Sequence, residues 1–193
     1  MLKSMTPAVA DSPVTIYVFP ASAPQNREER LSACMQAYAR SAEICLPCTI
    51  PAPGRNGRGK PCYPGLPVHF SITHSGDYWM CAFGGSPLGL DLQEHRECKK
   101  ESIARRFFSE EEKNYLEADH FQSFFAVWAA KESYVKYTGE GIGDSFSRFS
   151  AADANGLSEA IGKAFLRHIF FREEYSLCLC TESRREPVLV TMA

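Results

Sequence analysis

The strongest helical signal in this chain lies in residues 120–139, which read HFQSFFAVWAAKESYVKYTG. Phe124, Trp128 and Val135 supply apolar packing along this segment, and Thr138-Gly139 is typical of a helix end. We therefore expect a largely buried helix here, with several charged residues set among the apolar ones.

Two of those charged residues, Glu132 and Lys136, are four positions apart and share one face of the helix. The plain interpretation is a surface salt bridge worth about 0.2–0.5 kcal/mol. Glu132 follows bulky apolar neighbours, however, and an acid and a base on one face of a buried helix also suit a magnesium–pyrophosphate site. The carboxylate would hold Mg²⁺, and the ammonium would neutralise a phosphate oxygen.

A second acid, Asp91, lies between Leu90 and Leu92 in the apolar segment 87–92. In a strand its side chain points to the opposite face from the two leucines. A carboxylate at the end of such a strand is paired, solvated or bound to a metal. The sequence leaves these alternatives open.

A third cluster, Thr73-His74-Ser75-Gly76, directly follows an expected strand at 68–73. It reads either as an ordinary turn or as a phosphate-binding turn, in which a hydroxyl and an imidazole meet at a strand end. Both interpretations stay open at this point.

The other segments alternate between strand and helix patterns. Gly84-Gly85 predicts a hairpin turn, and Ser109-Glu-Glu-Glu112 has the form of a capping box. The expected strands are 14–19, 68–73, 77–83, 87–92, 145–150, 163–171, 174–181 and 187–191, and the expected helices are 26–45, 98–107, a short one ending near 117, and 120–137. This order predicts an α+β fold.

The composition excludes several classes of protein. The 193 residues carry a net charge of −2, whereas a general nucleic-acid binder shows a basic excess. No apolar run approaches the roughly 20 residues that span a membrane. The start, MLKSMTPAVADSP, lacks the apolar stretch of a signal peptide. We expect a frayed N-terminus and a cytoplasmic protein that binds neither nucleic acid nor membrane.

Eight cysteines are present, and without a secretion signal we expect reduced thiols. The alternative is Cys45-Leu-Pro-Cys48, a C-x-x-C pair that could bind zinc or do redox chemistry. No second pair has the spacing of a zinc finger. This alternative makes the chain a zinc- or redox-linked binding protein.

Taken together, the clusters resemble those of the 4′-phosphopantetheinyl transferases, in particular the pseudodimeric type that activates peptide and polyketide synthetases. The resemblance rests on the order of several motifs between residues 59 and 150. They are Gly59-Lys60-Pro61, Phe70-Ser-Ile-Thr-His74-Ser75-Gly76, Gly89-Leu-Asp91-Leu-Gln93, Arg106-Phe-Phe-Ser109-Glu-Glu111, Trp128-Ala-Ala-Lys131-Glu132-Ser133 with Lys136, and Gly139-Glu-Gly141.

The resemblance implies two similar α/β halves, 1–86 and 87–193, that form an intramolecular pseudodimer with the active site in the cleft between them. It implies coenzyme A as cosubstrate and Mg²⁺ as cofactor. The implied metal ligands are Asp91, Gln93 and Glu132, the implied catalytic residues are Asp91, Glu132 and Lys136, and the implied coenzyme contacts are Gly59, Lys60, Pro61, Thr73, His74, Lys131, Lys136 and Arg30, or else Arg27 in place of Arg30.

The implied reaction moves the phosphopantetheine arm of coenzyme A onto a serine of an apo acyl, peptidyl or aryl carrier protein and releases adenosine 3′,5′-bisphosphate. Glu132 would take the serine proton. A basic and apolar segment, 96–108, would dock the acidic carrier, and a chain that contains both halves would work as a monomer.

Two features depart from the family pattern. Gln93 stands where the family commonly has a second acid, and an amide oxygen can ligate Mg²⁺ without supplying charge. The alternative function is therefore a homologue that binds coenzyme A or a carrier with weak or no turnover. The N-terminal part also lacks a basic block for the 3′-phosphate, and basic residues at 55–60 would compensate.

Overall fold

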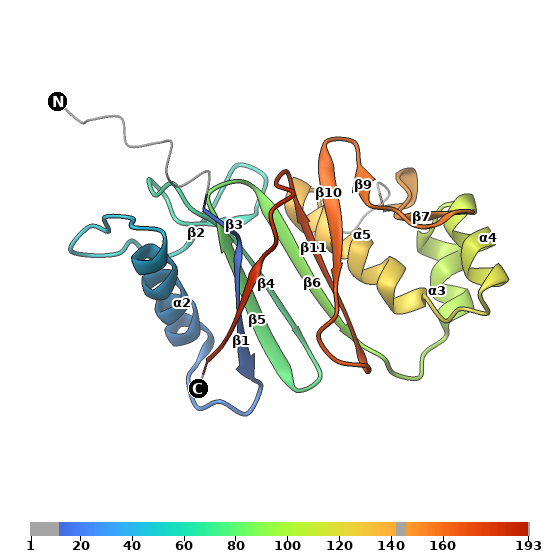
Figure 1. Ribbon diagram of the computed structural model, residues 1–193, viewed down its shortest axis with the longest axis horizontal. Helices are drawn as coiled ribbons and strands as arrows, with labels where there is room; N and C mark the ends of the chain where they lie inside the picture. Colours follow the sequence, from blue (N-terminus) through green and yellow to red (C-terminus); the bar gives the residue numbers. More distant parts are fainter. Residues whose placement is uncertain (1–11, 142–145, 193) are drawn as a thin grey trace.

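Two four-stranded sheets lie between two long helices (Figure 1). The computed structural model describes residues 12–141 and 146–192, so the expectation for the N-terminus falls mostly outside the described residues. The order of layers is helix α2, first sheet, second sheet and helix α5, with α3 and α4 beyond α5. This mixture of helices and sheets agrees with the expected α+β class.

The first sheet has the strand order β12-β1-β5-β4. Its strands are β1 (Thr15–Pro20), β4 (His69–Ser75), β5 (Tyr78–Gly84) and β12 (Val188–Thr191). The pairs β1–β5 and β4–β5 are antiparallel. Strand β12 pairs with β1 in parallel, with Thr15 opposite Val188. Strand β12 therefore returns from the second sheet to the sheet that contains β1.

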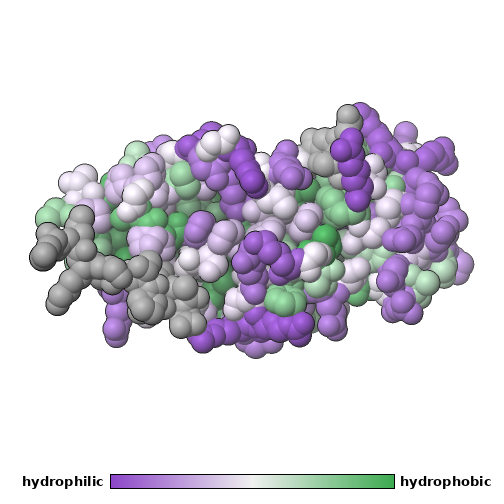
Figure 2. Space-filling model, turned by 90° about the horizontal axis from the view of Figure 1, so that it is seen from above, coloured by the Kyte–Doolittle hydropathy of each residue, from purple (hydrophilic) through white to green (hydrophobic). Residues whose placement is uncertain are grey.

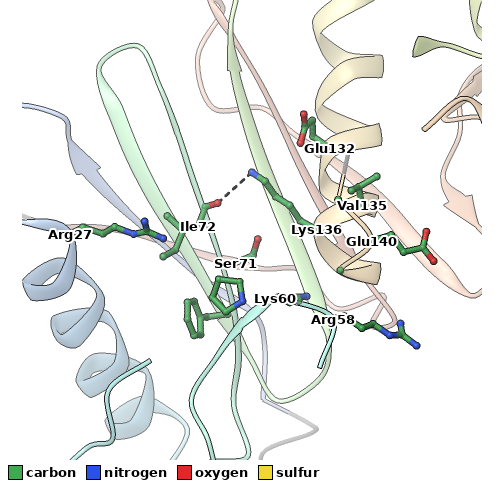
Figure 3. A pocket seen from close by; sticks show the side chains of 14 residues that line it. Arg27, Arg58, Lys60, Ser71, Ile72, Glu132, Val135, Lys136 and Glu140 are labelled. Carbon is green, nitrogen blue, oxygen red and sulfur yellow. Dashed lines mark hydrogen bonds between the residues drawn. The ribbon is translucent and has the colours of Figure 1, made fainter. Parts of the chain in front are cut away.

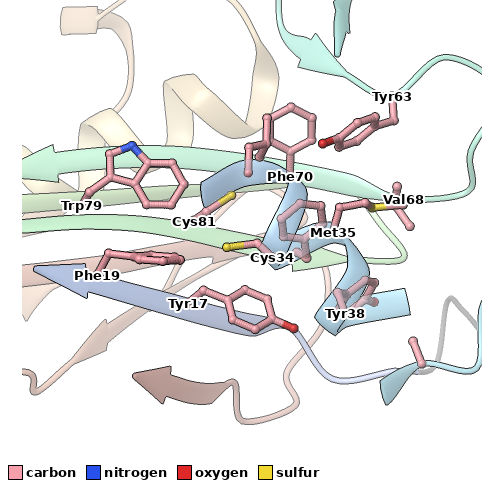
Figure 4. Close-up of a cluster of buried hydrophobic side chains, with 13 residues drawn as sticks. Tyr17, Phe19, Cys34, Met35, Tyr38, Tyr63, Val68, Phe70, Trp79 and Cys81 are labelled. Carbon is pink, nitrogen blue, oxygen red and sulfur yellow. The ribbon is translucent and has the colours of Figure 1, made fainter. Parts of the chain in front are cut away.

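Helix α2 (Arg27–Ser41) covers the outer face of the first sheet. It begins with a capping box in which Asn26 and Glu29 satisfy each other's backbone amides, and it ends at Ser41 rather than at the expected 45. Its apolar face packs against aromatic side chains of the sheet (Figure 4). These include Phe19, Phe70, Trp79 and Phe83.

The second sheet has the order β6-β11-β10-β9, from β6 (Leu88–Glu94), β9 (Ala160–Ile161), β10 (Ala164–Ile169) and β11 (Tyr175–Thr181). The predicted hairpin at Gly84-Gly85 is wrong, because β5 and β6 belong to different sheets and β6 pairs with β11 instead. Gly84 instead packs closely under neighbouring side chains: an added Cβ would lie 2.8 Å from Leu88 Cδ2, which would have to move. Inward-facing side chains of the two sheets form a shared apolar layer.

Helix α5 (Phe124–Thr138) packs on the outer face of the second sheet. It crosses β6 at Gly89, where an added Cβ would lie 1.9 Å from the carbonyl oxygen of Ser133. No side chain fits there, so the glycine lets the helix approach the strand. The predicted helix end is confirmed, because Gly139 adopts the left-handed conformation with φ of 78°.

Helices α3 (Lys100–Phe107) and α4 (Glu110–Ala118) pack beside α5. The predicted capping box is confirmed, with Ser109 and Glu112 bonded reciprocally. The predicted strand 145–150 is wrong over its described part, which contains a 3₁₀ turn, Phe146–Arg148; residue 145 lies outside the described residues. The short strands are β2 (Gly54–Arg55), β3 (Pro61–Cys62), β7 (Ala152–Asp153) and β8 (Gly156–Leu157).

Strands β4 and β6 are the edges at which the two sheets meet, and they are joined by side chains instead of a backbone ladder. We call this junction the β4–β6 seam. Three hydroxyls of β4 accept hydrogen bonds from backbone N–H groups of β6, namely Ser71 from Leu90 at 3.0 Å, Thr73 from Leu92 at 3.1 Å and Ser75 from Glu94 at 2.9 Å.

Two lysines supply the complementary donors at the seam. Lys60 Nζ donates to the carbonyl of Leu88 at 2.7 Å, and Lys136 Nζ donates to that of Leu90 at 3.1 Å. An unpaired strand edge is a liability that proteins cover or cap. Here side chains cap the edge of β6, and the two lysines bring positive charge to it.

Hydrophilic residues cover much of the face shown in Figure 2, with smaller hydrophobic patches between them. None of the helices in the described part of the chain combines the length and the hydropathy needed to cross a bilayer.

Candidate active site

A pocket of about 390 Å³ lies where α2, the loop before β3, β4 and the C-terminal half of α5 come together (Figure 3). Its walls carry four cationic and two anionic side chains: Arg27, Arg58, Lys60, Lys136, Glu132 and Glu140. Cations outnumber carboxylates, so the pocket favours an anionic ligand.

Asp91 lies beside this pocket, on β6, with only 3% of its surface exposed. Its Oδ1 accepts hydrogen bonds from Lys136 Nζ at 2.6 Å and from Thr73 Oγ1 at 3.2 Å. Its Oδ2 accepts one from Gln93 Nε2 at 2.6 Å. Of the alternatives open from the sequence, the structure shows a paired carboxylate, held by three donors.

Lys136 reaches from α5 to the seam (Figure 3). Besides Asp91, its ammonium contacts the carbonyls of Ile72 at 3.3 Å and Leu90 at 3.1 Å. A lysine has three donors, and all three have partners on the two strand edges. The expected surface pair between Glu132 and Lys136 is replaced by an ion pair between Lys136 and Asp91.

Glu132 lines the pocket one turn before Lys136. Burial raises the pKa of its carboxyl to about 7, and the negative charge of Asp91 adds to the rise, while Lys136 opposes it. Two carboxylates that disfavour each other's charge are a donor set that a divalent cation would stabilise. The structure thus brings together Asp91, Glu132 and Lys136.

Mg²⁺ commonly takes one or two carboxylates and fills its other positions with water and ligand phosphates. Asp91 and Glu132 fit that pattern. Gln93 presents its amide N–H to Asp91, so its oxygen would ligate a cation only after the amide turned over. Within residues 12–141 and 146–192, no group of three or more His, Cys, Asp or Glu side chains could hold a metal ion.

The loop before β3 closes the pocket opposite Glu132. Burial lowers the pKa of Lys60 to about 8, and its ammonium donates to Leu88 and to the carbonyl of Tyr137 at 3.3 Å. Arg58 Nη1 donates to the carbonyl of Thr138 at 3.2 Å. Both cations thus cap the C-terminus of α5, where carbonyl groups lack helical partners. Gly59 and Pro61 also line the pocket.

Thr73 and His74 belong to the candidate phosphate-binding turn, but in the structure their side chains have different surroundings. Thr73 is 4% exposed, and its hydroxyl is engaged by Leu92 and Asp91. His74 is exposed near the end of β4, on the same strand face as Ile72 of the pocket wall. Thr73 therefore contacts the carboxylate, and His74 lies one step beyond the pocket wall.

Lys131 corrects an expectation from the sequence. It is fully buried behind α5, away from the pocket, and its ammonium bonds both oxygens of Glu112 at 2.9 Å and the carbonyl of Phe149 at 2.7 Å. One residue of an α-helix turns the side chain by about 100°. Lys131 and Glu132 consequently face different neighbours, and Lys131 has no donor left for a coenzyme.

The structure also reverses the expected roles of the two arginines of α2. Arg30 is 7% exposed and lies over the rings of Phe19 and Trp79, and its Nη2 donates to the carbonyls of Ala21 and Ala23. Arg27, one turn earlier, lines the pocket. The structure thus makes Arg30 part of the packing and leaves Arg27 as the cation of α2 at the site.

The C-x-x-C pair that the sequence left as an alternative zinc or redox site is exposed: Cys45 and Cys48 lie in the loop after α2, and all eight cysteines are free, as expected for reduced thiols. The expected docking segment 96–108 includes α3, but Phe108 is only 2% exposed and Lys100 donates to the carbonyl of Phe121. Its available cations are therefore fewer than the sequence suggests.

Comparison with known proteins bears on this site. Residues 87–192 match the 4′-phosphopantetheinyl transferase superfamily. The chain is similar to 4′-phosphopantetheinyl transferase Sfp of Bacillus subtilis strain 168, with 42% identity over 97 residues, covering 46% of this chain and 43% of that protein. A second Bacillus subtilis 4′-phosphopantetheinyl transferase is 36% identical over 133 residues, covering 63% of this chain and 59% of that protein.

A more distant similarity is to 4′-phosphopantetheinyl transferase HetI of Nostoc sp., with 35% identity over 79 residues, covering 38% of this chain and 33% of that protein. The chain spans about half the length of the first two relatives.

Proposed function

The chain belongs to the 4′-phosphopantetheinyl transferase superfamily, and on that premise we propose that it transfers the 4′-phosphopantetheine group of coenzyme A to a serine of an apo carrier protein. The observation that carries the proposal is the meeting of Asp91, Glu132 and Lys136 beside a pocket walled by further cations. Anionic phosphates need this kind of neutralisation, and phosphoryl transfer depends mostly on positioning and charge.

The two sheets and their helices are the proposed pseudodimer, with the active site in the cleft at the seam. One half comprises residues 1–86 and the other 87–193. The proposed boundary falls between β5 and β6, where the chain passes from one sheet to the other, although β12 crosses back to the first sheet.

Coenzyme A would lie in the pocket with its pyrophosphate toward Asp91 and Glu132. Lys60, Gly59 and Pro61 would border the adenine. Arg27 replaces Arg30 as the proposed partner of the 3′-phosphate, because Arg27 lines the pocket and Arg30 is engaged elsewhere.

Lys136 would bind a phosphate oxygen by giving up one of its three present partners, Ile72, Leu90 or Asp91, and His74 would contact the phosphates from the end of β4. Asp91, Glu132 and, after its amide turns over, Gln93 would hold Mg²⁺. When bound, Mg²⁺ would polarise the phosphoryl oxygens and stabilise the departing bisphosphate.

In the proposed reaction the serine oxygen bonds to the β-phosphorus of coenzyme A, and the bond from that phosphorus to the bridging oxygen breaks. The bridging oxygen leaves with the electron pair as part of adenosine 3′,5′-bisphosphate. Glu132 accepts the serine proton.

The proposed partner is an apo acyl, peptidyl or aryl carrier protein, which the monomeric chain would meet with the basic residues around α3. Carrier proteins of these classes are acidic along their recognition helix, so the attraction would be electrostatic.

The direct test is to incubate the protein with coenzyme A, Mg²⁺ and several apo carriers and to measure the phosphopantetheine mass gain by mass spectrometry. We expect a gain with the wild type and little with Glu132→Gln. Glu140→Gln is the matched control, because it removes another carboxylate from the same pocket. A wild type that modifies none of the carriers would contradict the proposed transfer and leave a binding role.

A further inference from the structure

The three hydroxyls of the seam are not equivalent. Ser71, Thr73 and Ser75 each accept one hydrogen bond from the backbone of β6. Among the side chains of β4 that the structure describes, only Thr73 also bonds to a carboxylate, that of Asp91. One residue thus links the junction of the two sheets to the candidate metal-binding group.

The direction of this hydrogen bond follows from the donors available. The Thr73 oxygen accepts a hydrogen bond from the N–H of Leu92 at 3.1 Å, so Thr73 is the acceptor in that bond and keeps its own proton for another partner. A hydroxyl has one proton to give, and the carboxylate oxygen of Asp91, 3.2 Å away, is the acceptor beside it. The proton of Thr73 therefore points at Asp91.

The other two donors to Asp91 are less able to fix its orientation. Lys136 and Gln93 are long side chains with several rotatable bonds, and both are only partly buried. Thr73 is β-branched, has a single side-chain torsion for its hydroxyl oxygen, and is 4% exposed. Its position is set by the ladder between β4 and β5.

We propose that Thr73 is a positioning residue, whose hydroxyl holds the Asp91 carboxylate in the orientation that binds a divalent cation and ties that orientation to the register of the β4–β6 seam. This inference rests on the proposed function only in that the cation is the one the transfer would use. Groups that orient a metal ligand typically contribute 10–100-fold to metal affinity.

The test compares four proteins: wild type, Thr73→Val, Thr73→Ser and Ser71→Ala. Valine has nearly the shape of threonine without the hydroxyl, and serine restores the hydroxyl. Ser71→Ala is the matched control, because it removes a seam hydrogen bond of the same kind that touches no carboxylate. The readout is Mn²⁺ binding, followed by the electron paramagnetic resonance signal of the free ion, with and without coenzyme A and without any carrier protein.

We expect Thr73→Val to weaken Mn²⁺ binding about 10-fold or more, and Thr73→Ser and Ser71→Ala to stay within about twofold of the wild type. Thermal melting of all four proteins checks that they fold. Equal Mn²⁺ affinity in Thr73→Val and wild type would overturn the inference. So would an equal loss in Ser71→Ala, which would assign the effect to the seam alone, and so would a folded wild type that binds no Mn²⁺ in either condition.

The proposed function is tested separately, by the phosphopantetheine mass gain of the carrier protein. A wild type that modifies carriers while Thr73→Val binds Mn²⁺ normally overturns the inference alone. A wild type that modifies no carrier, while Thr73→Val loses Mn²⁺ and Thr73→Ser keeps it, overturns the transfer and supports the inference.

Discussion

Helix α5 carries two lysine–carboxylate pairs on different faces, and they differ in almost every physical respect. The side chains of Lys131 and Glu112 are both 0% exposed, and each oxygen of Glu112 has two donors, Lys131 and one backbone N–H, that of Ala151 or of Ser109. The side chains of Lys136 and Asp91 are 29% and 4% exposed, and a second carboxylate, Glu132, lies nearby.

The difference teaches what each pair can do. The Lys131–Glu112 pair is closed: every charge has its partners, so it can hold α4, α5 and the segment before β7 together but cannot receive a ligand. The Lys136–Asp91 pair is open to a pocket, and together with an ionised Glu132 the three groups carry one negative charge in excess. A metal cation can compensate an excess negative charge in a partly dry site.

The largest expected effect comes from breaking the closed pair. Lys131→Met leaves the Glu112 carboxylate buried without its cation, and we expect a loss of about 3–5 kcal/mol in the free energy of unfolding. Urea denaturation followed by circular dichroism measures it. Lys113→Met is the control, because its partner Glu110 is 85% exposed and the loss should stay below about 1 kcal/mol. Similar losses in the two variants would contradict the contrast.

The same substitution on the open pair should separate activity from stability. Lys136→Met removes a cation from the proposed phosphate site, and we expect the rate of carrier modification to fall about 100-fold. The free energy of unfolding should fall by only about 1–2 kcal/mol, because Asp91 keeps two other donors and borders a pocket. If stability fell as far as in Lys131→Met while modification stayed normal, the two pairs would be alike in function.

The excess carboxylate of the open pair should appear as a pH dependence of stability. The pKa of Glu132 rises from 4.5 in the unfolded chain to about 7 in the folded one. The folded state therefore binds the extra proton between these values, and its stability from this group is full below pH 4.5 and is lost as the pH rises through 7. The difference in the free energy of unfolding between wild type and Glu132→Gln should change by about 3 kcal/mol over that window, at about 1.4 kcal/mol per pH unit. A flat difference between pH 4 and 8 would contradict the burial of an excess charge.

The smallest expected effect concerns the far end of α5. Arg58→Ala removes the guanidinium that bonds the carbonyl of Thr138, and we expect a loss of about 0.5–1 kcal/mol, measured by thermal melting. Arg55→Ala is the control, because Arg55 bonds within its own loop, to the carbonyl of Gly59. A larger loss from Arg55→Ala would show that the loop, and not the helix end, uses these cations.

The sequence predicted local features well because local chemistry sets them. The capping box at Ser109 and the helix end at Gly139 depend on residues within a few positions of each other, and both are confirmed. The predicted turn at Gly84-Gly85 fails for the opposite reason. The strand before the turn, β5, already has partners on both sides, β4 and β1, whereas the strand after it, β6, pairs with β11, which lies far away in the chain and outside any local pattern.

The candidate site shows the same division. The family resemblance pointed to Asp91, Glu132 and Lys136, and the structure brings them together. The resemblance did not show that Lys131, unlike Glu132, lies away from the pocket, or that Arg27 rather than Arg30 lines it. These positions depend on which neighbours each side chain meets after folding. The alternation Ser71-x-Thr73-x-Ser75 was the available signal for the seam, since a strand with period-two hydroxyls presents them all to one side.

The parallel pairing of β12 with β1 has a consequence for how the protein is made. Strand β1 leaves the ribosome well before its neighbour Val188–Thr191, because Thr15 and its partner Val188 are 173 positions apart in the sequence. The first sheet therefore cannot be completed until these later residues have been synthesised. Contacts between such distant segments slow folding, and until residue 191 emerges one edge of β1 stays open to pairing with other nascent chains.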